Sequence, residues 1–154
     1  MSAAARCSRR QMLAAVAAGL ASAPALTQAS GWADHRQAGP FTIRADFSLA
    51  GYEPLFGELP HLQQDLTRML QVEPAREPVE MYLFRSEANY RSYLNERFPN
   101  IPSRTAMFIK GQGPGRVYAY VSRDLEVNVR HEGTHALLHA SLPMVPLWLD
   151  EGLA

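Results

Sequence analysis

The spacing of apolar residues along the chain predicts alternating strands and helices. "FTIRADF", Phe41 to Phe47, alternates strictly between apolar and polar residues, which is typical of a strand with one buried face. Between Pro54 and Gln71, leucines recur at every third or fourth position and predict an amphipathic helix, with a break or kink at Pro60 left open. "VEMYLF", from residue 79 to 84, predicts a second strand.

The second half of the chain continues the pattern and ends in helices. Ser86 suits the N-cap of a helix that Pro99 ends. "TAMFIK" and "RVYAYV" flank the cluster "GQGPG", which predicts a β-hairpin. A helix carrying "HEGTH" follows the hairpin and should end near Leu142, before Pro143 and Pro146. Since strands come early and helices close the chain, the order favours an α+β fold over a doubly wound parallel sheet.

The first 29 residues predict an export signal of the twin-arginine type. Arg9 and Arg10 precede a bulky apolar residue and a leucine, as in that signal. An alanine-rich stretch follows, which is too short to span a bilayer, and cleavage could follow Ala25 or Ala29. We therefore expect the twin-arginine export machinery as a partner and a periplasmic or extracellular destination. Residues 30–40 then read as a linker, and residues 41–154 as one domain.

Composition excludes several classes of site. Without the signal, twelve basic residues face fifteen acidic ones, a net charge of about −3. No basic patch stands out, so nucleic acid is not an expected partner. The single cysteine, Cys7, lies within the signal, so the exported part has no disulfide, thiolate ligand or cysteine nucleophile. Any metal must be held by histidine, aspartate or glutamate.

The stretch "HEGTH" has the chemistry of a zinc site. On a helix, His131 and His135 lie one turn apart on the same face, so both imidazoles can reach one metal ion. Glu132 lies about 100° around the helix from His131, beside the metal, where a general base belongs. Gly133 lies on the opposite face, and close packing against the sheet would explain a glycine there.

A catalytic zinc usually has three protein ligands, and the sequence offers two further candidates. His139 lies two turns from His131, roughly 12 Å along the axis, so the two cannot share an ion on a straight helix. His139 is therefore expected near the ligands or in solvent. Glu151 is the better third ligand, because Pro146 can open a second helix that turns back toward the first. We expect Trp148 and Leu149 to lie in the core and to orient this second helix.

Together, "HEGTH" and "PLWLDEGLA" resemble the gluzincins of the peptidase-MA-like group, whose signature is H-E-x-x-H followed by W-L-x-E-G-x-A. The match covers about 25 residues. The resemblance implies a zincin-like fold: a small mixed sheet with a hairpin, the H-E-x-x-H helix, and the start of a second ligand helix. It implies that His131, His135 and Glu151 bind Zn²⁺ and that Glu132 is the catalytic base. The family's remaining parts, including the group that stabilises the oxyanion, follow the second motif, so we expect the C-terminal part of the domain to be missing from this sequence.

The sequence thus predicts an exported zinc metallopeptidase acting on a peptide or protein substrate. By analogy with the family it resembles, and because an edge strand is expected there, a strand of the hairpin, Thr105–Lys110 or Arg116–Val121, could bind the substrate backbone by strand addition. Two alternatives stay open: a zinc-binding module without catalysis, and an inactive fragment of a longer peptidase. Because a segment is expected to be missing, we expect weak zinc binding and poor turnover from these residues alone.

Overall fold

The computed structural model describes residues 31–142 and 144–154. Five strands and four helices follow one another in these residues. The strands are β1 (Asp34–Ala38), β2 (Phe41–Ala45), β3 (Val79–Phe84), β4 (Ala106–Ile109) and β5 (Arg116–Tyr120). The helices are α1 (Glu53–Leu70), α2 (Glu87–Arg97), α3 (Leu125–Ser141) and α4 (Leu147–Leu153).

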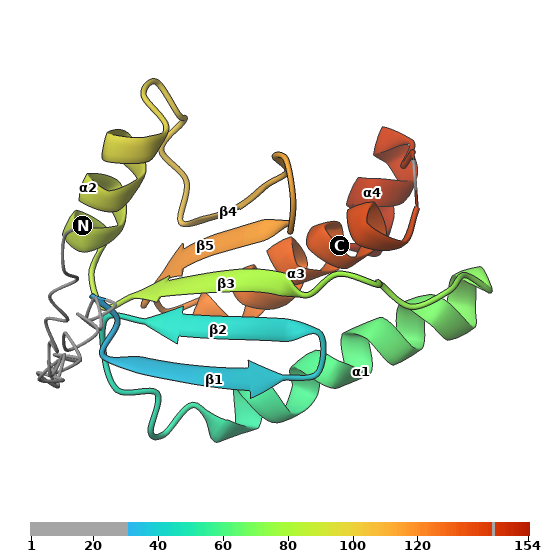
Figure 1. Cartoon of the computed structure of the whole chain (residues 1–154), viewed down its shortest axis with the longest axis horizontal. Coiled ribbons are helices and arrows are strands. Elements are labelled where there is room, and N and C mark those ends of the chain that lie inside the picture. The colour runs from blue at the N-terminus through green and yellow to red at the C-terminus, as the bar shows by residue number, and fades with distance from the viewer. Residues whose placement is uncertain (1–30, 143) are drawn as a thin grey trace, which may run out of the picture.

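The strands form one mixed sheet in the order β1-β2-β3-β5-β4. β2, β3 and β5 run parallel, while the hairpins β1–β2 and β4–β5 add an antiparallel strand at each edge (Figure 1). The α+β class and the predicted β4–β5 hairpin are confirmed. β5 is paired on both sides, whereas β4 has one edge that no other strand of the described residues occupies.

The two faces of the sheet carry separate apolar clusters, and β3 supplies both. Val79, Met81 and Leu83 belong to the main core, which α1 and α3 cover. Tyr82 and Phe84 point to the other face and pack with Tyr90 and Leu94 of α2 and with neighbouring aromatic side chains. The sequence "VEMYLF" is therefore almost continuously apolar because β3 is a central strand covered on both sides. Packing in the main core holds α3 against the sheet and thereby positions the side chains of "HEGTH".

The prediction of a linker over residues 30–40 is wrong in part, because Asp34–Ala38 form strand β1. Each residue of β1 pairs with one of β2, from Asp34 opposite Ala45 to Ala38 opposite Phe41. The sequence "DHRQA" shows no alternation of apolar and polar residues, because this edge strand buries only Ala38. The strand could therefore not be recognised from the hydrophobic pattern. The domain therefore begins before Phe41.

The other predicted elements fall close to their expected bounds. α1 continues through Pro60 as one helix, so the break considered there does not occur. α3 ends at Ser141 with Leu142 as its C-cap, as predicted. Among the described residues, no helix is both long enough and apolar enough to cross a membrane. The predicted export signal, residues 1–29, lies outside the described residues.

Gly133 is less tightly enclosed than the sequence suggested. A Cβ atom at this position would lie 3.4 Å from the Phe41 ring and 3.8 Å from a methyl group of Leu62, which are ordinary contact distances. Glycine inside a helix costs about 1 kcal/mol relative to alanine. The packing therefore leaves room for the side chain that would stabilise α3.

We expect Gly133→Ala to raise the free energy of unfolding by up to about 1 kcal/mol, measured by urea denaturation. Gly57→Ala is the matched control, because Gly57 lies inside α1 and a Cβ there meets no atom within 4 Å. If Gly133→Ala lowers stability while Gly57→Ala raises it, then close packing does require the glycine.

Candidate metal centre

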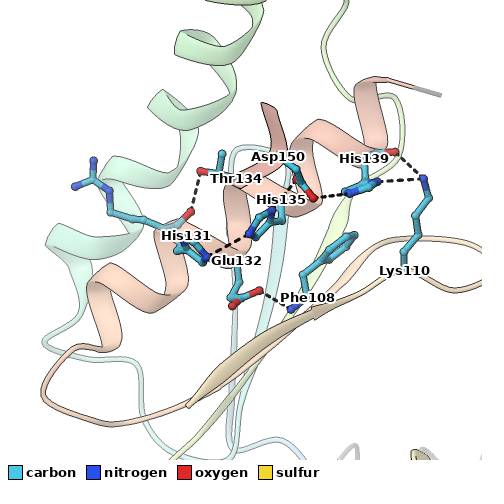
Figure 2. A network of polar contacts seen from close by, with 9 residues as sticks. Phe108, Lys110, His131, Glu132, Thr134, His135, His139 and Asp150 are labelled. Atoms are coloured by element: carbon cyan, nitrogen blue, oxygen red, sulfur yellow. Dashed lines mark hydrogen bonds and ion pairs between the residues drawn. The ribbon is translucent and has the colours of Figure 1, made fainter. Parts of the chain in front are cut away.

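Helix α3 presents His131 and His135 on one face, where His131 is half-buried and His135 is buried. One face of the helix is in the core through Val129, Ala136 and Leu137. The two histidines lie one turn apart on another face, and their Nε2 atoms are 3.2 Å apart (Figure 2). The rings are nearly perpendicular, with centroids 4.7 Å apart. The pairing expected from the helical spacing is confirmed.

Glu151 reaches the same place from α4. Pro146 caps the N-terminus of this helix, as the sequence predicted. One ligand atom each from His131, His135 and Glu151 lies within 4.8 Å of the others. Two imidazole nitrogens and one carboxylate oxygen form a donor set typical of catalytic zinc, which keeps a fourth position open. The residues therefore fit a zinc ion in donor type and proximity.

Glu132 lies beside this cluster and is bound to the edge of the sheet. The backbone N–H of Phe108 donates a hydrogen bond of 2.7 Å to Oε2 of Glu132 (Figure 2). This N–H points away from β5, because β4 is an edge strand and Glu132 lies on its free side. The bond fixes the carboxylate between the strand and the histidines and leaves Oε1 available.

Asp150 links the two helices, and the sequence reasoning did not identify it. Its Oδ1 lies 2.6 Å from Nδ1 of His135, and its Oδ2 lies 3.1 Å from Nε2 of His139. Burial raises the pKa of this carboxyl, but hydrogen bonds from His135 and His139 outweigh that effect and hold the pKa below its usual range. Asp150 therefore stays ionised at neutral pH and orients a candidate ligand, as carboxylates commonly do beside zinc-binding histidines.

His139 lies next to the cluster and is not a member of it. Its ring nitrogen faces Asp150, and Lys110 lies on its other side (Figure 2). The expectation that His139 lies near the ligands is confirmed, because it contacts Asp150, which in turn contacts His135. The alternative that it lies in open solvent is wrong, because only 23% of its side chain is exposed.

Trp148 is not a core residue, contrary to expectation. It is 76% exposed, and its neighbour Leu147 is 73% exposed. Leu149 is only half-buried, and α4 contains no buried residue. A helical segment of seven residues has too few turns to bury an apolar stripe. Polar contacts with α3 hold it in position instead.

A cavity of about 600 Å³ opens beside the site. Its lining includes Phe108 of β4 and the following Lys110, Ala136 and His139 of α3, and the segment between α1 and β3. Side chains of both charge signs line it, including Arg76 and Glu77. The β4 residue that binds Glu132, Phe108, thus also lines an open pocket large enough for a side chain of a bound molecule.

Neither the sequence patterns of known protein families nor the curated proteins give a match to this chain. The site is therefore described by its geometry alone: His131, His135 and Glu151 meet at one place, and Glu132 lies beside them.

Proposed function

We propose that this protein is an exported zinc-dependent metallopeptidase that hydrolyses peptide bonds. The observation that carries the proposal is the convergence of His131, His135 and Glu151 from two helices, within 4.8 Å of one another. Glu132 next to this cluster supplies the residue that such a reaction needs as a base. A chance H-E-x-x-H helix would not require a carboxylate from a separate helix at the same point.

In this proposal His131, His135 and Glu151 would hold Zn²⁺, which acts as a Lewis acid toward the scissile carbonyl and the attacking water. Glu132 accepts the proton of the attacking water and delivers it to the leaving amine. Phe108 N–H occupies Oε2 of Glu132, which leaves Oε1 to accept the proton. Asp150 orients the imidazole of His135.

The sheet supports one of the two strands considered for substrate binding. β5 has a neighbour on each side and cannot accept another strand, whereas β4 has a free edge next to Glu132. An extended peptide along β4 would pass Glu132 and reach the cavity that Lys110 and His139 line. Because Phe108 N–H already binds Glu132, the peptide would pair with other backbone groups of the strand or displace this bond.

A zinc-binding module without catalysis is the second candidate, and one observation favours it. The hydrogen bond from Phe108 N–H gives Glu132 a structural role that needs no reaction. Both candidates share the same zinc ligands, so only a turnover measurement separates them.

Zinc binding tests the ligand set. We expect the mature protein to bind one zinc ion by elemental analysis, and His131→Ala to abolish binding because one of three ligands is lost. His139→Ala should keep the stoichiometry at one under saturating zinc, as should the control His61→Ala on α1. Retention of zinc in Glu151→Ala together with its loss in His139→Ala would show that the third ligand is wrongly assigned.

Turnover tests the base. Glu132→Gln should keep zinc and accept the same hydrogen bond from Phe108 N–H, since its amide oxygen can replace Oε2. Its peptidase rate should fall by about 10²–10⁴ because the glutamine cannot accept the proton. Zinc binding without any peptidase activity in the wild-type protein would favour the two alternatives, the non-catalytic module or an inactive fragment of a longer peptidase. Equal rates in both proteins would contradict the assigned mechanism.

The export part of the proposal depends on Arg9 and Arg10. Replacing both with lysine keeps the charge but removes the paired arginines that the twin-arginine machinery reads, so precursor should accumulate in the cytoplasm. Cell fractionation with an antibody measures this. Unchanged export of the double variant would point to an ordinary secretory signal.

A further inference from the structure

Few contacts hold α4, the helix that carries Glu151, in place. It has no buried residue, and its two largest apolar side chains, Leu147 and Trp148, are exposed. Within residues 31–142 and 144–154, the side-chain hydrogen bonds that join α3 to α4 both end on Asp150. Because Asp150 directly precedes Glu151, whatever holds Asp150 also holds the backbone of the candidate ligand.

The chemistry of these two bonds determines where the protons lie. An ionised carboxylate can only accept hydrogen bonds, so each imidazole that faces Asp150 must donate. His135 therefore carries a proton on Nδ1, and His139 carries one on Nε2. In neutral His135 this leaves the lone pair on Nε2, the atom that lies 3.2 Å from Nε2 of His131. The bridge thus selects the form of His135 that can bind a metal at the cluster.

Two residues of the β4 segment hold His139 in the matching form. The Phe108 ring stacks on the His139 ring, with centroids 5.4 Å apart and an angle of 29° between the planes. Nζ of Lys110 lies 3.5 Å from Nδ1 of His139 and 3.4 Å from its carbonyl oxygen. An ammonium group only donates, so this contact is compatible with a lone pair on Nδ1 and with the proton on Nε2 that faces Asp150.

We propose that His139 is a positioning residue of the metal centre: through Asp150 it holds α4 and Glu151 against α3 and keeps the His135 proton on Nδ1. This rests on the proposed zinc site and adds a role for a residue outside the ligand set. Figure 2 shows the whole chain of contacts, from Lys110 through His139 and Asp150 to His135 and His131.

The energetic reason lies in the order of α4 before metal binds. A helical segment of seven residues is marginal on its own and needs contacts with other elements to stay ordered. If Asp150 is held by two histidines, Glu151 is already near the cluster, and the metal need not order the helix. If one histidine is lost, part of the metal's binding free energy is spent on that ordering.

Two variants separate the hydrogen bond from the ring. His139→Phe keeps an aromatic ring for the Phe108 stack but cannot donate to Asp150. We expect it to bind one zinc with an affinity reduced about 10- to 100-fold, the usual effect of losing such an outer contact. His139→Gln retains an N–H donor and should recover most of that affinity. His61→Phe is the matched control, because His61 lies on the exposed surface of α1 and should leave the affinity unchanged.

A measurement on the metal-free protein keeps this test independent of zinc. Nitrogen-15 NMR of the imidazoles should show the Nδ1–H form of His135 in the wild type and a mixture of forms in His139→Phe. Amide hydrogen exchange in α4 should accelerate in His139→Phe, while exchange in α1 stays the same. An unchanged zinc affinity, His135 proton position and α4 exchange rate in His139→Phe would overturn the proposal. If the wild type binds no zinc, the metal centre fails, and the NMR and exchange data still decide whether His139 holds α4.

Discussion

The burial of one face of α3 between α1 and the sheet determines where the α3 residues of the candidate site point. Val129, Ala136 and Leu137 are almost completely buried in the main core, so the helix cannot rotate about its axis without exposing them. Burying side chains of this size contributes about 1.5–3 kcal/mol for each large one, and the cost of exposing several exceeds what any polar contact at the site could recover. His131 and His135 are thus fixed side by side by packing on the far side of the helix.

The second helix of the site obeys a different rule. α4 has no apolar face in the core, and its position follows from hydrogen bonds to α3 rather than from packing. Such contacts are directional, so they specify where Asp150 and Glu151 lie more sharply than an apolar surface would. They also contribute less to stability, because protein hydrogen bonds replace bonds to water. The site therefore combines a rigid half on α3 with a half on α4 that depends on a few polar groups.

Sequence patterns predicted the elements whose burial repeats regularly and missed those that depend on partners far along the chain. Alternation revealed β2, leucine spacing revealed α1, and proline positions marked the end of α3 and the start of α4. β1 escaped because its exposed positions are polar and its only strong requirement is pairing with β2. The composition of residues 30–40 is typical of a linker, but composition does not reveal the pairing of β1 with β2.

The site shows the same division between local and distant contacts. Helical periodicity placed His131, Glu132 and His135 correctly because all three lie within two turns. Asp150 meets His135 across 15 positions of sequence, and no periodicity within one helix predicts a contact between two helices. Trp148 was assigned to the core because it is large and apolar, but a short helix at the surface does not bury it. The apolar character of a residue therefore does not predict its burial when the helix that carries it is short.

Glu132 connects helix α3 with the edge of the sheet, at the point where the proposed reaction would place its substrate. Its carboxylate satisfies a backbone N–H on the free edge of β4. The unpaired backbone groups of an edge strand can form hydrogen bonds with another strand. In β4 one of these groups, the N–H of Phe108, already donates to Glu132. The same free edge is the only side of the hairpin that could hold an extended peptide, since β5 is enclosed. The residue assigned as the base therefore also limits how a peptide can approach, because any strand that pairs at Phe108 must first compete with the Glu132 carboxylate for the same hydrogen.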